Sequence, residues 1–397
     1  MKLFSQNKGR FDLRPFFFTA VLSYGCTEPL AIDITNSDSV LVVDASITDE
    51  HKYHEILLSR SSQSDIEDPI PEQSAQLKIV MEDQQEFSFS EVEPGKYVSD
   101  MAFAAQANNL YELRITSSNG KRYRSNSVEL QQETQIDSVY AEFTQTDSGL
   151  QGIDIKVDSF DPTGNSTYFR YKYTETYKII APEWYPWELV VVNENPLAIS
   201  DELHTEEKRV CFATEASNNI ILTNTKNATE DRVTGFTVRF LSKDNFIISH
   251  RYSILVSQYV LSREAYEFYD RLKAFSELES IFSQAQPGFI IGNIFPEDDS
   301  NERVVGFFEV SSVSKKRIFF SYEDFFPNEP LPPFIDECKR TLVLDKSALA
   351  IAVRDQLISL AGIQNISLGE VLYYVQPRPC GDCTALGSNV VPGFWEE

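Results

Sequence analysis

Apolar and polar residues alternate one by one over several short stretches of this chain. Clear examples are YELRIT at 111–116, IDIKVD at 153–158, FRYKYT at 169–174 and FTVRF at 236–240. Successive side chains of a strand point to opposite faces, so this period of two predicts strands with one buried and one solvent-facing side. The pattern therefore predicts a mainly β fold.

Six apolar or alternating stretches follow one another near the N-terminus, with turn residues between them. They lie at 40–48, 54–59, 75–81, 95–99, 111–116 and 121–125. Short strands at this spacing are typical of an immunoglobulin- or fibronectin-like β-sandwich, which we place at residues 26–130. The polar stretch QQETQIDS at 131–138 marks the boundary, and residues 131–397 are predicted to form a larger β-rich domain with inserted helices.

Two stretches of this second part follow a helical period instead. Residues 262–284 are predicted to be helical, with Ser262 as N-cap and an apolar stripe formed by Ala265, Phe268, Leu272, Phe275 and Ile281. Residues 346–361 are predicted to form a second helix that begins after Asp345, ends before Gly362 and buries Leu349, Val353, Leu357 and Leu360. We interpret both stripes as core packing.

The N-terminus has the layout of a secretory signal. Four basic residues and one acid are followed by the apolar run FFFTAVLSYG at 16–25, which directly precedes Cys26. This run is too short for a membrane-spanning helix, which needs about 20 apolar residues. Small residues before a cysteine resemble a bacterial lipobox, although Leu22 lies one position further from the cysteine than usual. We therefore expect residues 1–25 to be a lipoprotein signal peptide and Cys26 to be lipidated, the alternative being a simple signal with an ordinary cysteine.

The net charge is strongly negative. The chain has 35 basic and 60 acidic residues, hence a charge of −25, and loss of residues 1–25 leaves 31 basic and 59 acidic residues, or −28. Such a surface repels nucleic acids and anionic headgroups, so nucleic-acid binding is a poor hypothesis.

Local motifs for catalysis or metal binding are absent from the sequence. There is no Gly-rich phosphate loop, no Gly-x-Ser-x-Gly elbow and no EF-hand loop. His51 and His54 are three positions apart near a strand, which places them on opposite faces and argues against a zinc pair. The acidic stretches at 65–68 and 296–302 are interpreted as solvated loops rather than calcium sites. We therefore predict no catalytic residues, no metal and no cofactor, although paired carboxylates distant in sequence stay open as an alternative.

Four cysteines remain beyond Cys26: Cys211, Cys338, Cys380 and Cys383. Export to an oxidising compartment favours disulfides over redox or metal chemistry, and four cysteines allow three connectivities. A bond from Cys380 or Cys383 to Cys338 closes a loop of about 40 residues, with a chain-entropy gain of roughly 4 kcal/mol. We therefore expect one of this pair to reach Cys338, with Cys211 available to the other, and Phe394 and Trp395 to pack on the second domain.

Several blocks, in this order, resemble a known family. They are LVVDASIT at 41–48, RYSILVSQY at 251–259, LSREAYEFY at 261–269, QPGFIIGNIF at 286–295, VVGFFEVSSVSKKRIFF at 304–320 and CGDCTALGSNVVPGFW at 380–395. Together they resemble Bacteroidota outer-membrane lipoproteins catalogued only as a domain of unknown function, whose genes commonly lie beside those of TonB-dependent receptors. The resemblance carries no catalytic residues.

The resemblance implies a lipid-anchored protein of the outer membrane, at its periplasmic face or the cell surface. Its implied partner is a β-barrel, in particular a TonB-dependent receptor, and its implied role is accessory or binding, assisting uptake of an unidentified substrate. We expect it not to be an enzyme. A structural or adhesive surface protein and a hydrolase whose residues converge only in the fold are the alternatives.

Overall fold

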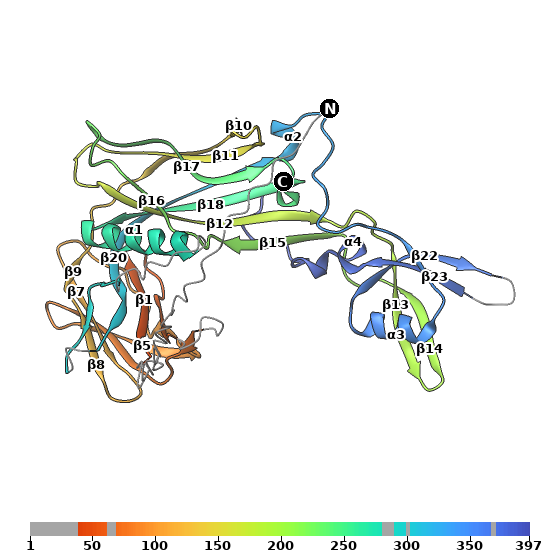
Figure 1. The fold of residues 1–397 in the computed structure, drawn as a ribbon, viewed down its shortest axis with the longest axis horizontal. Coiled ribbons are helices and arrows are strands. Elements are labelled where there is room, and N and C mark those ends of the chain that lie inside the picture. The colour runs from red at the N-terminus through yellow and green to blue at the C-terminus, as the bar shows by residue number, and fades with distance from the viewer. Residues whose placement is uncertain (1–38, 62–68, 280–289, 299–301, 367–370) are drawn as a thin grey trace, which may run out of the picture. The chain divides into compact units, whose positions relative to one another are not determined.

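Strands make up most of the regular structure of the chain (Figure 1). The structure, a computed structural model, describes residues 39–61, 69–279, 290–298, 302–366 and 371–397. Each of the four alternating stretches that opened the sequence analysis lies within a strand, and the mainly β class is confirmed. Within the described residues, no helix is both long and apolar enough to cross a membrane.

The N-terminal strands enclose a compact apolar core. In β1 (Leu41–Thr48) the odd-numbered positions are buried, as the alternating sequence requires, and Tyr97, Tyr111 and Tyr123 are among the largest fully buried side chains. The other strands here are β2 (Glu55–Arg60), β3 (Ile70–Pro71), β4 (Gln76–Met81), β5 (Glu86–Glu93), β6 (Lys96–Ser99), β7 (Leu110–Thr116), β8 (Arg122–Ser125) and β9 (Val128–Glu129).

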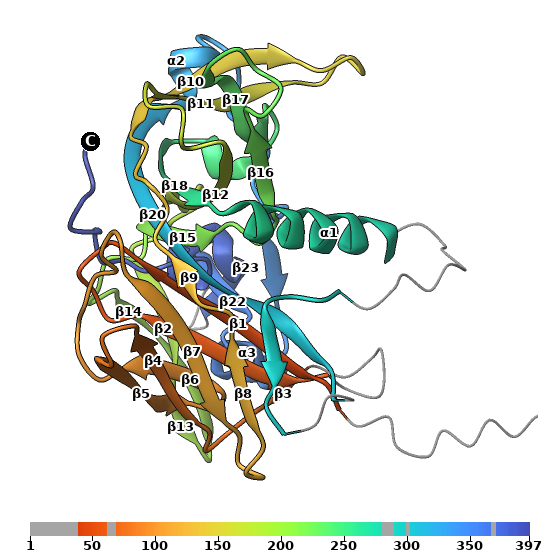
Figure 2. The ribbon, with the colours of Figure 1, turned by 90° about the vertical axis from the view of Figure 1, so that its left-hand side faces the viewer.

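Strands from later in the chain complete this core. β1 pairs in parallel with β20 (Val304–Ser321), and β8 pairs with β19 (Ile294–Pro296). Figure 2 shows β1 beside β20, and Phe308 of β20 belongs to the same apolar cluster as the N-terminal strands. Residues on both sides of the boundary proposed at 131–138 therefore share one sheet, and the proposed division into domains stays a prediction.

A second core lies between two sheets of long strands. β12, β18 and β20 are neighbours in the large sheet, and β10, β11 and β17 form a separate three-stranded sheet. Side chains of both contribute to one apolar cluster, for example Tyr171 and Ile254 with Val157 and Leu241. The strands are β10 (Ile136–Gln145), β11 (Gln151–Asp161), β12 (Tyr168–Ile180), β15 (Val210–Ala216), β16 (Ile221–Asn224), β17 (Asp231–Ser242) and β18 (Arg251–Leu261).

The first predicted helix is present as α1 (Arg263–Glu279). Ser262 accepts a hydrogen bond from the backbone N–H of Ala265 at 3.1 Å, the N-cap role expected from the sequence. Ala265 and Phe268 are buried with Phe307 of β20, and Leu272 packs beside them. The predicted end at residues 280–284, with Ile281, lies outside the described residues.

The second predicted helix is wrong in its C-terminal half. α3 spans only Lys346–Arg354, with Asp345 as N-cap, and residues 358–365 form β22 (Ile358–Asn365). Gln356 has φ of 52°, a left-handed conformation that ends the helix, and β22 then pairs with β23 (Val371–Pro377). Leu357, expected in the buried seam, is 61% exposed. Apolar positions three and four apart had fitted a helix, but strand pairing outweighs that spacing.

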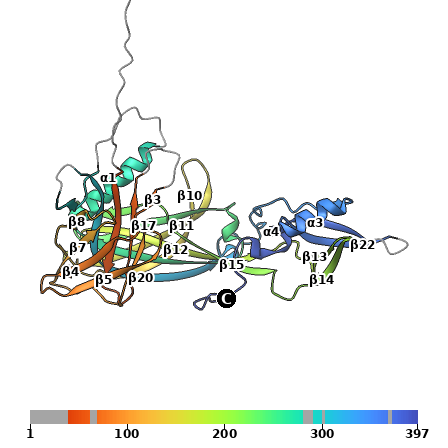
Figure 3. The same cartoon turned by 90° about the horizontal axis from the view of Figure 1, so that it is seen from below.

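α3 belongs to a small subdomain formed by residues 187–203, 341–366 and 371–377. Its strands are β13 (Trp187–Glu194), β14 (Leu197–Leu203), β21 (Thr341–Val343), β22 and β23. Figure 1 shows β13, β14, β22 and β23 grouped with α3, and Figure 3 shows β13, β14 and β22 near it. Leu349, Leu360, Tyr373 and Val375 form its core. The remaining short helices of the described chain are η1 (Phe246–Ile248), α2 (Tyr322–Phe325), α4 (Arg378–Gly381) and η2 (Cys383–Ala385).

Candidate functional site

One face of the sheet β21–β23–β22 packs into the core of the small subdomain, and apolar side chains also lie on the opposite face. Tyr373 and Val375 of β23 point to α3 and the β13–β14 hairpin. Tyr374 points to the opposite face and lies directly across from Leu342 of β21. Leu342 is exposed, and Tyr374 is half-buried.

Other apolar side chains of the small subdomain also reach solvent. Leu344, which follows β21, is 73% exposed, and Ile351 of α3 is 52% exposed. Isolated surface leucines need no explanation, but several large ones in one small subdomain are typical of an interaction surface. Seven large apolar side chains of the small subdomain are exposed, and we refer to them together as its exposed apolar surface: Val192, Leu203, Leu342, Leu344, Ile351, Leu357 and Ile366.

A cavity of about 370 Å³ opens between β13, α3, the start of β22 and α4. Its ionisable side chains largely satisfy one another: Lys208 pairs with Glu188, and Arg378 pairs with Asp382 at 2.9 Å. Burial alone raises the pKa of Asp382, but hydrogen bonds from Thr384 and Arg378 bring that pKa below its usual value. We interpret these paired groups as structural parts of the cavity wall.

His204 is the remaining group of chemical interest in this cavity. Its Nδ1 lies 3.6 Å from Glu188, beyond hydrogen-bond distance, and makes no hydrogen bond among the described residues. Glu188 is already engaged by Lys208. A histidine beside a carboxylate can serve as a general base, and Ser359 lines the same cavity. Ser359 donates to the Pro377 carbonyl, and no hydrogen bond joins it to His204 among the described residues, so the three side chains lack the hydrogen bonds of a catalytic triad.

Two disulfides hold the C-terminal segment. Cys211 of β15 is bonded to Cys383, and Cys338 is bonded to Cys380. Each member of the closely spaced pair therefore reaches a distant cysteine, in agreement with the loop-closure argument from the sequence. Backbone hydrogen bonds of 2.9 Å reinforce the attachment, from Cys383 N–H to Lys208 O and from Glu183 N–H to Cys380 O.

The aromatic end of the tail also packs on the body of the protein. The Trp395 ring makes edge contacts with Phe212 and Phe319, at centroid distances of 4.8 and 5.8 Å. Phe394 lies under the guanidinium of Arg317 at 3.6 Å. The tail is thus pinned at both ends of residues 380–395.

Cys26 lies outside the described residues, so its lipidation stays a prediction. The acidic stretch at 65–68 lies outside them as well, and of the stretch at 296–302 the structure describes only 296–298 and 302. Asp298 pairs with Arg122 at 2.6 Å rather than facing solvent alone. Within the described ranges, no group of three or more His, Cys, Asp or Glu side chains is arranged to hold a metal ion.

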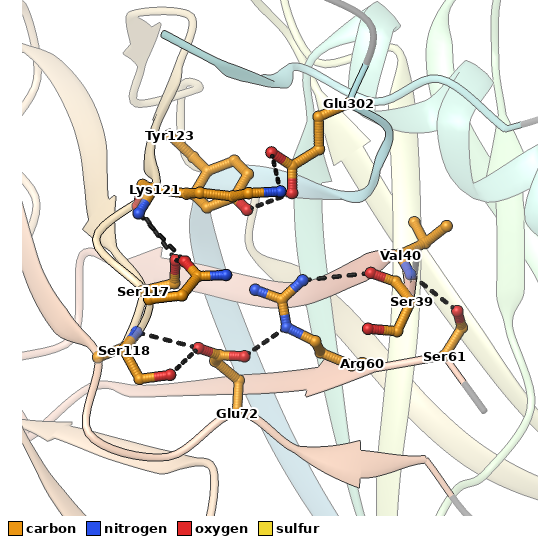
Figure 4. Close-up of polar contacts among 12 residues, drawn as sticks. Ser39, Val40, Arg60, Ser61, Glu72, Ser117, Ser118, Lys121, Tyr123 and Glu302 are labelled. Atoms are coloured by element: carbon orange, nitrogen blue, oxygen red, sulfur yellow. Dashed lines mark hydrogen bonds and ion pairs between the residues drawn. The ribbon is translucent and has the colours of Figure 1, made fainter. Parts of the chain in front are cut away.

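Glu302 belongs to a polar network beside the N-terminal core (Figure 4). It accepts a hydrogen bond from the Tyr123 hydroxyl at 2.6 Å and pairs with Lys121 at 3.1 Å. Burial, followed by this hydrogen bond, raises the pKa of Tyr123 to about 12. In the same view Glu72 is bonded by Arg60 and Ser118. These groups satisfy one another, so we interpret the network as structural.

His54 is buried in the same core, whereas His51 is exposed. The His54 Nε2 lies 2.9 Å from the carbonyl oxygen of Phe103, and the two rings pack with their centroids 4.5 Å apart. Desolvation lowers the pKa of His54 to about 4, because burial disfavours the charged imidazolium.

This buried histidine predicts a loss of stability in mild acid. The unfolded chain binds a proton at His54 near pH 6.5, while the folded chain resists until about pH 4, so stability falls as pH drops through this window. We expect the wild-type chain to lose about 2.5 kcal/mol more than His54→Gln between pH 7 and 4.5, by urea unfolding at both values. Equal losses in both proteins would contradict this.

Arg170 and Glu309 form a buried ion pair that the sequence did not predict. Strand alternation predicts that Arg170 faces water, but it is 6% exposed because α1 covers that face of β12. Its guanidinium lies 3.0 Å from Glu309 and 4.4 Å from the ring centre of Tyr269. Burial would lower the pKa of Arg170, but the attraction of Glu309 raises it. No local motif signals this pair, since its members are 139 positions apart.

Comparison with known proteins gives a family but no activity. A family profile described as a domain of unknown function, DUF4249, matches residues 27–317. Among solved structures, a DUF4785 family protein from Legionella pneumophila aligns with 10% identity over 55% of this chain and 51% of that chain, with a TM-score of 0.15. The alignment thus spans about half of that protein's length, and its low TM-score supports no inference. The search of curated proteins gave no match.

Proposed function

Since the chain belongs to this family of unknown function, we propose, from the resemblance described above together with its exposed apolar surface, that it is a lipid-anchored accessory protein of the outer membrane. It associates with a β-barrel, in particular a TonB-dependent receptor, and assists uptake of a substrate. The observation that carries the proposal is the exposed apolar surface of the small subdomain, where Leu344 is 73% and Leu357 is 61% exposed. Apolar surface of this kind supports docking to another protein.

The anchor makes a modest docking surface sufficient. Twelve residues, 27–38, separate Cys26 from the first described residue, Ser39. Fully extended, this segment reaches at most about 45 Å, so the tethered protein stays close to the membrane surface. Confinement beside an integral partner raises the effective concentration, and an interface of low intrinsic affinity is then occupied.

Two features separate this proposal from an adhesive or enzymatic role. In the cavity near α4, Lys208 is paired with Glu188 and Arg378 with Asp382, and the Nδ1 of His204 makes no hydrogen bond to Glu188 or Ser359 among the described residues. The small subdomain contributes seven of the exposed large apolar side chains of the described residues, a local concentration that suits a docking surface, although others, such as Leu57 and Val390, lie elsewhere along the chain.

Affinity purification of the tagged full-length protein in mild detergent, followed by mass spectrometry, tests the proposal. We expect a β-barrel protein to be enriched at least about 10-fold over an untagged control. The variant Leu344→Glu/Ile351→Glu should lose this enrichment. The matched control Val92→Glu/Met101→Glu, which changes two exposed apolar residues in the N-terminal part, should keep it.

Two outcomes would overturn the proposal. One is that no β-barrel protein is enriched. Turnover of a glycan or peptide library would then favour an enzyme, and binding to a surface polymer would favour an adhesive protein. The other is an equal loss of enrichment in both double variants.

A further inference from the structure

A second cavity, of about 340 Å³, lies where α1 covers the large sheet. Its apolar wall includes Phe268 and Leu272 of α1 and Phe307 of β20, and the Phe268 and Phe307 rings contact each other at 5.4 Å. This volume is in the range of small-molecule sites, which are mostly apolar with a few fixed polar groups. The cavity is distinct from the exposed apolar surface of the small subdomain.

One end of this cavity carries a fixed cation. Arg170 lines it, and its guanidinium is held over the rings of Tyr259 and Tyr269 at 5.2 and 4.4 Å while one nitrogen contacts Glu309. The Nε of Arg170 is buried and makes no hydrogen bond within the described residues. A buried donor without a partner is unusual in a folded protein, and a ligand acceptor would satisfy it.

A second cation lies at the same end. Lys172 is two positions further along β12 and so points to the same face as Arg170. The Lys172 Nζ lies 6.0 Å from the centre of the Tyr259 ring. Among the described residues, no carboxylate lies within ion-pair distance of Lys172. Lys172 itself is exposed to solvent, and repulsion from Arg170 is the main cause that lowers its pKa, while Asp44 and Glu309 act in the opposite direction. Asp44 also lines the cavity but forms no ion pair with Lys172.

We infer that this cavity binds a small amphipathic carboxylate. The carboxylate pairs with Lys172 and approaches the guanidinium of Arg170, and the apolar chain lies against Phe268, Leu272 and Phe307. Glu309 and Asp44 balance the formal charges of Arg170 and Lys172, so the anion is held by direct contacts with the Lys172 ammonium and with the Arg170 Nε, which has no hydrogen-bond partner among the described residues. The inference does not depend on association with a barrel.

Isothermal titration of the full-length protein in detergent with octanoate tests the inference, with heats corrected by titration into detergent alone. The neutral comparator is 1-octanol, which has the same chain length. We expect saturable binding of one octanoate, at least about 10-fold tighter than 1-octanol. Lys172→Gln should weaken octanoate at least about 10-fold and leave 1-octanol unchanged, while Leu272→Asp should abolish both.

Lys178→Gln is the matched control, because Lys178 lies on the same strand but pairs with Glu397 outside this cavity. It should bind octanoate as the wild-type protein does, and thermal unfolding should confirm that the variants fold. The inference is overturned by no saturable octanoate binding, by equal affinities for octanoate and 1-octanol, or by a Lys172→Gln variant that behaves like Lys178→Gln.

Discussion

Replacing Cys211 and Cys383 by alanine is expected to lower the free energy of unfolding by about 5 kcal/mol, among the largest effects of any change to this chain. The bond joins residues 172 positions apart, so its loss returns a large loop to the unfolded ensemble. The corresponding change at Cys338 and Cys380, 42 positions apart, should cost about 4 kcal/mol.

Urea unfolding of oxidised wild-type protein and of both double variants measures these losses. Reductant provides the matched control, because it should destabilise the wild-type protein but leave a variant without the four cysteines unchanged. A double variant as stable as the wild-type chain would show that the corresponding bond does not constrain the unfolded state.

Replacing Glu309 by glutamine is expected to cost about 3–5 kcal/mol, because it leaves the buried guanidinium of Arg170 without its counter-charge. The side chains are 7% and 1% exposed, so water cannot compensate. Ser311, which donates to Glu309 at 2.7 Å, loses its charged acceptor as well.

Removing both charges separates this effect from simple loss of packing. The double variant Arg170→Met/Glu309→Leu should recover to within about 1 kcal/mol of the wild-type stability, since apolar side chains of similar size often replace a buried pair without loss. Urea unfolding of the two single variants and the double variant gives the coupling energy. A Glu309→Gln variant that loses less than about 1 kcal/mol would contradict a fully desolvated pair.

The strands were predictable from sequence because their physics is local. A half-buried strand needs alternating side chains, and β1 and β11 show that pattern in both sequence and burial. Ser262 and Asp345 likewise act as N-caps where the sequence placed them, because a cap depends only on residues two or three positions away.

The pairing of strands from distant parts of the chain could not be predicted from the sequence. The parallel pairing of β1 with β20 joins segments more than 250 residues apart, and nothing near β1 indicates its partner. Residues 358–365 carry apolar spacing that suits a helix, yet they pair with β23. Strand alternation places Arg170 towards solvent, but α1 covers that side of β12.

The candidate sites divide in the same way. Cysteine pairing was open to a loop-length argument because the relevant energy belongs to the unfolded chain. The exposed apolar surface of the small subdomain was not predictable, since Leu357 was expected to be buried in a longer helix. The cavity under α1 depends on side chains from β12, β20 and α1, which only the fold brings together.

Photo-crosslinking in living cells tests most directly whether the small subdomain docks on a barrel. A photoreactive phenylalanine derivative is placed at Leu344, and in a separate strain at Val92 of β5, which is 58% exposed in the N-terminal part. We predict that Leu344 forms a crosslink to an outer-membrane β-barrel and that Val92 forms little or none. Crosslinks to a barrel from Val92 but not from Leu344, or no barrel adduct at either position, would contradict the proposed function.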